Sequence, residues 1–517
     1  MSDKKGIPIL PSSWQSVRLG DFVENDKGKK PKNQSKEKTD EYCMPYIDIK
    51  AFEKGIYASY TDGVGCRLCS EEDFLMVWDG SRSGLVGKGV KGAVGSTLVR
   101  INFPRIVNNY AYYFLQSKYL EINTRAKGVG IPHVDPNLLW GYEFPIPPFK
   151  EQHRIVSKVE ELFSEIDKGV ESLKTAKAQL QVYRQALLKH AFEGKLTEQW
   201  RKDNPDKVTP ATELLEQIKL AREQRYQQRL SDWGQEVKLW EAEGKEDKKP
   251  SKPSSIEPFN AIESNEMDKL AKLPCGWAWI KFENLIEYVT SGSRGWAEYY
   301  SDSGAIFIRA QNLKYDRLEL DDIAYVMLPK GVEGKRTLTK KDDLLITITG
   351  ANVTKTARVK KELDEAYVSQ HVALCRLING ELGNYLYMFL IAGTGGRKQL
   401  EKLAYGAGKP GLNLNNIKNM VVPVTSTEES VVIAQLLDCN DSELDQINRD
   451  LIEQMAKSSI LKQSILKKAF SAQLVEQDPN DEPASKLLER IQAEKLALAA
   501  AAKLAKASTK KRATKSA

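Results

Sequence analysis

Two long stretches of the chain carry apolar residues at alternating steps of three and four, the spacing of a coiled-coil seam. The first seam comprises Ile155, Val159, Leu162, Ile166, Val170, Leu173, Ala176, Leu180, Tyr183, Leu187 and Ala191. The second comprises Ile433, Leu437, Leu444, Ile447, Leu451, Met455, Leu461, Ile465 and Ala469, with Asn440 and Ser458 as polar interruptions. About forty helical residues would form a rod of about 60 Å. An isolated amphipathic rod needs a partner, so we expect the two helices to form an antiparallel pair.

The segments before these helices, roughly residues 10–145 and 273–423, show a different pattern. Short apolar, β-prone runs at 74–78 and 344–348 end at Gly80 and Gly350, as strands followed by turns do. Residues 109–120 and 384–390 have the character of short helices. Each segment is therefore predicted to be a compact domain of mixed α/β structure.

The chain also repeats itself. Five stretches occur twice in the same order: Leu10–Trp14 and Leu273–Trp277, Asp73–Gly80 and Asp343–Gly350, Asn109–Leu115 and Asn384–Leu390, Leu188–Phe192 and Leu466–Phe470, and Ala211–Glu216 and Ala484–Glu489. The separation between copies drifts only from 263 residues (Leu10 to Leu273) to 278 residues (Leu188 to Leu466). Collinear matches of this kind predict an internal duplication of one module, an α/β domain followed by a long helix.

Composition narrows the class of protein. The chain has 517 residues, 41% hydrophobic and 28% charged, and a net charge of +7, which permits a nucleic-acid partner. It contains no apolar run long enough to span a bilayer and no signal-peptide pattern, so we expect no membrane partner. Six cysteines in a chain of this length form no disulfide framework, which favours a cytoplasmic location.

Two stretches carry a family resemblance. Residues 144–156 contain a proline pair, then Glu-Gln, then the start of a long helix, and residues 192–201 (Phe-Glu-Gly-Lys-Leu-Thr-Glu-Gln-Trp-Arg) follow the end of that helix. Together with the duplication, they resemble the specificity subunit of type I restriction-modification enzymes over nearly the whole chain. The second junction, residues 423–429, lacks the proline pair and the glutamine, but residues 466–474 match the end of the first helix.

The resemblance implies a DNA-recognition subunit with no catalytic centre of its own. Two target-recognition domains would each read half of a bipartite, asymmetric site on double-stranded DNA, and the helices would set their spacing. The helices would also bind two adenine-N6 methyltransferase subunits, which motor-nuclease subunits join. S-adenosylmethionine, ATP and magnesium would bind those partners, and no cofactor would bind this chain. The predicted parts are recognition domain 1 (1–145), helical spacer 1 (146–220), a charged helix and flexible linker (221–270), recognition domain 2 (271–423), helical spacer 2 (424–500) and a basic disordered tail (501–517).

Candidate DNA contacts lie in polar loops that follow strands. Arginine and lysine pair with guanine, asparagine and glutamine pair with adenine, and phosphates accept hydrogen bonds from any of these side chains. In the first domain the candidates are Ser81, Arg82, Lys88, Lys91, Arg125, Lys127 and His133. In the second they are Arg309, Gln311, Asn312, Asn352, Lys355, Gln370, His371, Tyr405 and Lys409.

Signals for other chemistry are weaker. Residues 87–92 fit a dinucleotide-binding glycine pattern but open no predicted helix, so a basic DNA-facing loop is favoured. Asp322, Glu333 and Lys335 loosely fit a metal-dependent nuclease. Cys66 and Cys69, completed by Cys43 and His133, would form an irregular zinc site, for which buried free thiols are the commoner alternative.

Three other functions stay open at this point. The chain could serve a related multisubunit enzyme of type IIB, act alone as a nuclease, or be a coiled-coil scaffold. Cleavage lost in Glu333→Ala would support the nuclease, and DNA binding unchanged in Arg82→Ala and Asn352→Ala would support the scaffold.

Overall fold

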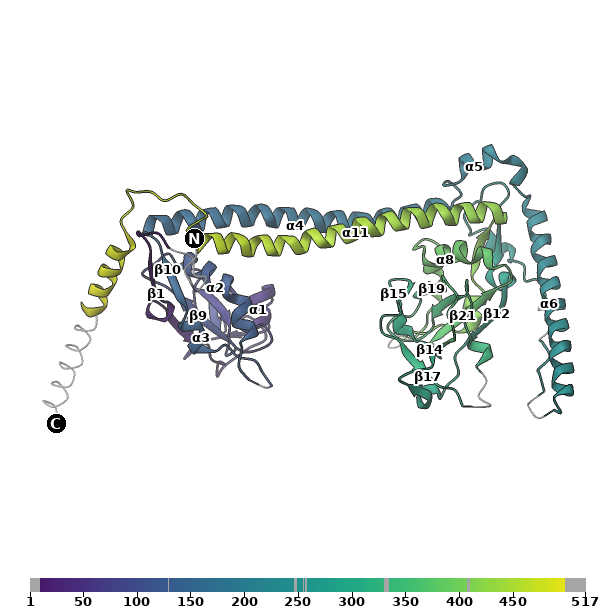
Figure 1. The fold of residues 1–517 in the computed structure, drawn as a ribbon, viewed down its shortest axis with the longest axis horizontal. Coiled ribbons are helices and arrows are strands. Elements are labelled where there is room, and N and C mark those ends of the chain that lie inside the picture. The colour runs from purple at the N-terminus through teal and green to yellow at the C-terminus, as the bar shows by residue number, and fades with distance from the viewer. Residues whose placement is uncertain are drawn as a thin grey trace. The chain divides into compact units, whose positions relative to one another are not determined.

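The computed structural model describes residues 10–128, 130–245, 249–253, 255, 258–329, 334–406 and 410–497. The chain divides into two compact units. Unit 1 comprises residues 1–174 and 452–517, and unit 2 comprises residues 175–451. Each unit contains one globular domain and part of both long helices, α4 (Phe149–Phe192) and α11 (Thr427–Ala469) (Figure 1).

The globular domain of unit 1 is built on two four-stranded sheets. One has the antiparallel order β2 (Glu24–Lys27), β9 (Leu98–Asn102), β6 (Phe74–Val77), β7 (Val86–Lys88). The other has the order β4 (Tyr60–Thr61), β3 (Met44–Ile47), β8 (Gly92–Val94), β5 (Leu68–Cys69), with β3 and β8 parallel. Strand β1 (Gln15–Arg18) pairs with β10 (Glu143–Ile146), and the helices are α1 (Ile49–Lys54), α2 (Asn108–Thr124) and α3 (Pro136–Trp140).

Unit 2 repeats the first sheet and the parallel pair of the second, whose edge strands differ. Its first sheet has the order β12 (Ile286–Ser291), β21 (Val372–Leu377), β18 (Leu344–Thr347), β19 (Thr356–Arg358). Its second has the order β13 (Tyr300–Ser301), β17 (Ala324–Val326), β14 (Ala305–Ile308), β20 (Ala366–Val368), with β14 and β20 parallel. Strand β11 (Ala278–Lys281) pairs with β22 (Val421–Val424), and β15 (Leu313–Lys314) with β16 (Arg317–Leu318). The helices include α8 (Gly383–Ile391), α9 (Gly396–Leu403) and α10 (Leu414–Lys418).

The predicted α/β class, the strands after residues 73 and 343, and the helices after residues 108 and 383 are thus confirmed.

The two long helices pack against each other, in opposite directions within each unit. In unit 1 the Lys462 ammonium lies 2.6 Å from Asp167, and in unit 2 the Arg184 guanidinium lies 2.6 Å from Asp445. The two pairs are related by the 278-residue repeat, because Arg184 is equivalent to Lys462 and Asp167 is equivalent to Asp445. One cross-helix ion pair therefore occurs twice.

The seam predicted for α11 is wrong at two positions. Ile447 and Leu461 are 47% and 51% exposed, while the neighbouring Asn448 and Lys462 are half-buried. The half-buried positions follow steps of three and four through Asn448, Ser458 and Lys462. Polar residues therefore occupy the seam here, and Ile447 and Leu461 lie beside it. Tyr183, placed on the first seam, is also 53% exposed.

The end of each long helix enters the core of the domain in the same unit. Phe470, just after α11, lies 5.2 Å from the rings of both Tyr110 and Phe114 in unit 1. Phe192, the last residue of α4, lies 5.3 Å from Tyr385 and 5.2 Å from Phe389 in unit 2. Because aromatic pairs bury large areas, these contacts fix each domain to the helix end.

A buried glutamate in the first turn of each long helix makes a second attachment. The indole nitrogen of Trp14 donates to Glu151 at 3.2 Å, and that of Trp277 donates to Glu429 at 3.0 Å. The second junction therefore keeps this carboxylate although it lacks the proline pair and the glutamine of the first.

Helix α6 (Ala211–Ala242) includes the charged helix predicted from residue 221 and packs Leu214 into the core of unit 2. The matching segment near the C-terminus packs Ala484, Leu487 and Ile491 into the core of unit 1. The short helices α5 (Glu198–Asp203) and α7 (Ser264–Met267) flank α6 in the chain. Among the described residues, no helix is both long and apolar enough to cross a membrane. The predicted tail, 501–517, lies outside the described residues.

Candidate nucleic-acid interface

In unit 1, two loops that are distant in sequence are joined by backbone bridges. Asp79 and Lys127 each form a β-bridge with His133, and the Gly80 amide donates to the Pro132 carbonyl at 2.7 Å. Gly80 has a φ of 121°, a conformation that side chains rarely allow. The turn holding Ser81 and Arg82 is therefore held against the loop that holds Lys127 and His133.

Unit 2 contains the same bridges. Thr349 and Tyr405 both pair with Gly411, and Gly350 has a φ of 99°. His371 is hydrogen-bonded through its ring to Thr349 on one side and Gln370 on the other. The predicted residues Gln370, His371 and Tyr405 thus lie around one turn.

The two bridged loops share a backbone but carry different side chains. The positions of Lys127 and His133 correspond to Tyr405 and Gly411 through the 278-residue repeat, and Asp79 corresponds to Thr349 in the aligned strands. A cation, an imidazole and a carboxylate in unit 1 are thus replaced by a phenol, a glycine and a hydroxyl. The same backbone frame, defined by these bridges, therefore presents two chemically different surfaces.

Most of the candidate cations of unit 1 are paired with acids. The ion-pair distances are 2.6 Å for Arg82 and Glu53, 3.4 Å for Arg125 and Glu121, 2.8 Å for Lys127 and Asp135, and 3.6 Å for Lys88 and Glu160. The hydrogen bond from Lys127 is the main cause of a lowered pKa of Asp135. Lys88 faces α4, which carries Glu160, whereas Lys91 and Ser81 are exposed.

In unit 2 the loop after β14 is organised by internal hydrogen bonds. The Asn312 amide is 2% exposed and donates to the carbonyls of Glu319 and Asp322, so it holds the loop together. Arg309 and Gln311 both contact the Asp322 carboxylate, at 3.3 Å and 2.9 Å.

The turn after β18 approaches this loop. Asn352 donates to the Ala310 carbonyl at 3.3 Å, and Lys355 lies 3.9 Å from Asp316. The predicted contact Lys409 lies outside the described residues.

The glycines at 87–92 have a structural explanation. They lie on and between β7 and β8, and no helix follows them. A Cβ on Gly89 would lie 2.2 Å from the Ser70 carbonyl oxygen, and one on Gly92 would lie 2.6 Å from that of Pro45. Close approach of backbone therefore requires glycine at both positions.

The residues described do not assemble the alternative metal sites. No group of three His, Cys, Asp or Glu side chains lies close enough to hold a metal within the described ranges. Burial raises the pKa of the Cys69 thiol to about 11, which opposes formation of a thiolate ligand. Asp322 binds Arg309 and Gln311, and Glu333 lies outside the described residues.

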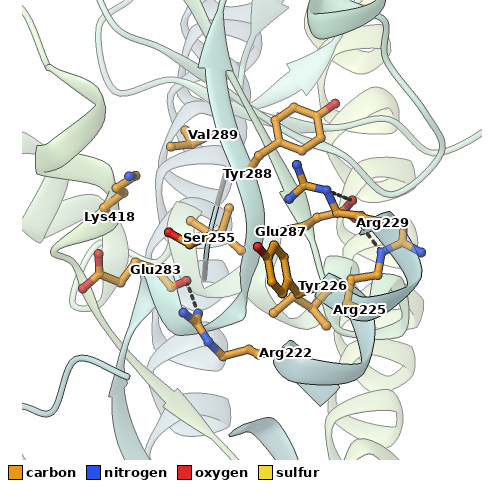
Figure 2. A pocket seen from close by; sticks show the side chains of 12 residues that line it. Arg222, Arg225, Tyr226, Arg229, Ser255, Glu283, Glu287, Tyr288, Val289 and Lys418 are labelled. Carbon is orange, nitrogen blue, oxygen red and sulfur yellow. Dashed lines mark hydrogen bonds and ion pairs between the residues drawn. The ribbon is translucent and has the colours of Figure 1, made fainter. Parts of the chain in front are cut away.

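A polar cavity in unit 2 lies between α6 and β12 (Figure 2). Arg225 and Arg229 approach the Glu287 carboxylate at 3.0 Å and 3.9 Å, and Arg222 donates to the Glu283 carbonyl at 2.9 Å. These contacts join α6 to the domain, so the charged lining has a structural role.

Sequence reasoning missed two sets of surface residues. One is Asp79 and Thr349 at the bridged turns, which the aligned repeat could have identified. The other is a pair of adjacent apolar residues on each long helix: Val182 and Tyr183 are 71% and 53% exposed, and Ile460 and Leu461 are 69% and 51% exposed. Each member is 278 residues from its counterpart, so the repeat itself was the available signal.

A duplicated α/β domain, attached at repeated positions to a helix pair, defines a scaffold that presents two different polar surfaces. The family model for the type I restriction modification DNA specificity domain matches residues 11–175 and again 298–456, more than half of the chain. The chain therefore belongs to this family, as a specificity subunit of a type I restriction-modification system that is not itself catalytic.

Individual relatives agree with this assignment. The chain is 22% identical to the type I restriction enzyme MjaVIII specificity subunit of Methanocaldococcus jannaschii, over 87% of this chain and 91% of that protein. It is 23% identical to the EcoBI specificity subunit of Escherichia coli, over 88% of this chain and 86% of that one. A chain from a structural study of complex assembly and conformational transition in the type I system shares the fold. Its TM-score is 0.61 at 16% identity, covering 90% of this chain and 100% of that chain.

Proposed function

We propose that the chain reads a bipartite, asymmetric site on double-stranded DNA, with one half-site for each recognition domain. The comparison of the bridged loops supports this proposal, because the frame is repeated while Lys127 and Tyr405 occupy the same position. Base recognition depends on which donors, acceptors and apolar groups reach the groove. Two different surfaces on one frame therefore fit two different half-sites.

The proposed division of labour follows the predicted boundaries. Residues 1–145 and 271–423 would read DNA, residues 146–220 and 424–500 would set the spacing, and residues 221–270 would connect the two modules. Within these domains the DNA contacts that we propose are the loop residues named above. All six cysteines are free, which fits a reducing cytoplasm.

We further propose that two identical methyltransferase subunits bind the long helices. The exposed pairs Val182–Tyr183 and Ile460–Leu461 support this idea, since exposed apolar side chains mark interaction sites and these occur at equivalent positions. A partner present in two copies would find the same contact twice. Motor-nuclease subunits would join this complex, and S-adenosylmethionine, ATP and magnesium would bind to the partners.

In this arrangement the chain holds the DNA while the partner acts. An adenine inside a duplex is inaccessible to a methyltransferase until it is flipped out of the stack. Fixed recognition domains would keep the target base opposite the active site of each partner.

Substitution of the exposed pairs tests the partner proposal. Val182→Asp with Tyr183→Asp should reduce the methyltransferase content of the purified complex from two subunits to one. Ile460→Asp with Leu461→Asp should do the same, and the combined variant should carry none. Leu120→Asp, at a residue of α2 that is 72% exposed, is the matched control and should keep two. Two subunits retained in both helix variants would contradict the proposal.

A second test concerns reading. Asn352→Ala should relax base preference at one half-site only, by about 1–3 kcal/mol if the amide makes a bidentate contact with adenine. Selection of methylated sites from a random DNA library measures both half-sites together. If the base preference at every position of both half-sites were the same in the variant as in the wild type, Asn352 would be excluded as a reading residue.

A further inference from the structure

A lysine-rich loop in unit 1 is not used by the function proposed above. Residues 27–38, from the last residue of β2 into the segment before β3, hold one acid, Glu37, and six lysines: Lys27, Lys29, Lys30, Lys32, Lys36 and Lys38. Counted from the matching glycines Gly28 and Gly292, the equivalent residues 291–302 hold one arginine and two acids. The basic loop is therefore a property of one module only.

The loop is attached to the domain near its start and again at Ser35. A Cβ on Gly28 would lie 2.2 Å from the Gly95 carbonyl oxygen, so glycine lets the backbone lie against β8 and its following turn. The Lys29 amide donates to Val94 at 3.1 Å. Ser35 and Tyr60 exchange backbone hydrogen bonds of 2.9 Å and 2.8 Å. The stretch between these two attachments is thus presented from a defined place on the domain.

The loop begins beside the candidate interface. The Lys27 ammonium lies 2.9 Å from the Asp79 carboxylate, and Asp79 is the residue that bridges to His133. The start of the basic loop is therefore in direct contact with the bridged turn of unit 1.

The charge of the loop is unbalanced in its first half. Lys29, Lys30 and Lys32 are exposed, and their side chains make no ion pair or hydrogen bond with any part of the chain that the structure describes. The nearest preceding acid, Asp26, is already bound by Arg100 at 2.7 Å.

The second half of the loop is nearer to neutrality. Lys36 and Lys38 follow the Ser35–Tyr60 attachment and alternate with Glu37, and Asp40 and Glu41 come next in the chain. The excess positive charge therefore lies at residues 29–32.

We propose that Lys29, Lys30 and Lys32 bind DNA phosphates beside the half-site read by the first recognition domain. This inference rests on the proposed DNA-reading function. Phosphates require cations but no particular base, so these lysines would add affinity without adding sequence preference. The second domain lacks the equivalent charge, and the first domain therefore supplies more of the sequence-independent binding.

The salt dependence of binding tests the proposal. The variant Lys29→Gln/Lys30→Gln/Lys32→Gln is assembled with its methyltransferase subunits, and its affinity for a cognate and a scrambled duplex is measured over a range of salt concentrations. The affinity falls with salt, and each lost phosphate contact makes the negative slope of log K against log salt shallower by about 0.9, so three lost contacts make it shallower by about 2.7. Both duplexes should be weakened by a similar factor, and the methylated motif should stay the same.

Two control variants use the same loop. Lys36→Gln/Lys38→Gln should leave the slope near that of the wild type, and replacement of Lys29, Lys30 and Lys32 by arginine should preserve it. A triple glutamine variant with the wild-type slope would overturn the proposal, as would weakening of the cognate duplex alone. A wild-type complex that does not distinguish the two duplexes would instead refute the DNA-reading function on which the proposal rests.

Discussion

The two modules of this chain agree where they attach to the helices and differ where they are exposed. Phe470 and Phe192 enter the two domain cores with ring separations of 5.2–5.3 Å, and Glu151 and Glu429 accept from equivalent tryptophans. The bridged turns, by contrast, carry Asp79, Lys127 and His133 in one unit but Thr349, Tyr405 and Gly411 in the other.

This difference separates two requirements on the sequence. Contacts that hold a domain to a helix pair serve the same purpose in both modules, so their chemistry repeats. Surfaces that face a ligand repeat only if the two ligands are the same. The contrast is therefore what a subunit needs when identical partners bind it but the two halves of its target differ.

The aromatic anchors should produce the largest effects. Phe192→Ala removes a buried ring from the core of unit 2, which costs about 3–5 kcal/mol, and Phe470→Ala removes a half-buried ring packed against the core of unit 1, which should cost somewhat less. We expect the loss in unit 2 for Phe192→Ala and in unit 1 for Phe470→Ala. Hydrogen exchange of the α8 and α2 amides reports the two units separately. If either variant destabilised both units equally, the anchors would not be local to their modules.

The buried glutamates should be unequally sensitive. Burial raises the pKa of Glu151, and Trp14 is its one side-chain hydrogen-bond donor among the described residues, whereas Glu429 also accepts from Thr197, Thr425 and Arg201. Trp14→Phe should therefore cost about 1–3 kcal/mol in unit 1, because a buried acceptor loses its donor. Trp277→Phe should cost less in unit 2. Hydrogen exchange measured at increasing denaturant gives the stability of each unit. A larger loss of stability in unit 2 for Trp277→Phe than in unit 1 for Trp14→Phe would contradict this account.

The cross-helix ion pairs should have small effects, larger for Arg184 than for Lys462. Arg184→Met and Lys462→Met each remove a partly exposed pair, worth about 0.2–1 kcal/mol. The loss should be larger for Arg184, because it also contacts Asp441 at 2.8 Å. Thermal melting at low and high salt provides the measurement, since screening should shrink both differences. A salt-independent loss would instead point to packing of the side-chain stems.

Acid should weaken the helix pair of unit 2 slightly. Burial raises the pKa of Asp445, but the hydrogen bond from Arg184 and the charge of Arg317 outweigh it, so the pKa is lowered from 3.8. A lowered carboxyl pKa stabilises the fold above the unfolded value, and this contribution is lost as pH falls through the folded value. Asp445→Asn should therefore reduce the dependence of the melting temperature on pH below about 4. If the melting temperature fell with acid equally in the variant and the wild type, Asp445 would not contribute to the acid sensitivity.

Much of the fold follows from the sequence because it depends on local periodicity. The strand at 74–77 and the helix starting at 108 are apolar runs of the right length, and the duplication lends each prediction a second copy. The seam of α11 is harder to predict from periodicity. Ile447 and Asn448 are adjacent, and the apolar residue is the exposed one, because the partner helix determines which position is covered.

The candidate interface depends more on contacts between distant residues. The glycine turns were visible in the sequence, but the pairing of Arg82 with Glu53 and the burial of Asn312 were not, since both arise from tertiary packing. The lysines at 27–38 are clustered in the sequence but were not among the predicted DNA contacts. The place of this loop next to Asp79 required the fold.

The central claim is that the two domains read different half-sites independently. Adenine methylation across the genome, measured by single-molecule sequencing, tests it in cells that carry the chain with residues 273–423 exchanged for those of a relative. The account predicts one split, asymmetric motif that disappears when the gene is deleted and changes in one half only after the exchange. A motif that survives deletion while the methyltransferase is expressed, or that changes in both halves after the exchange, would contradict it.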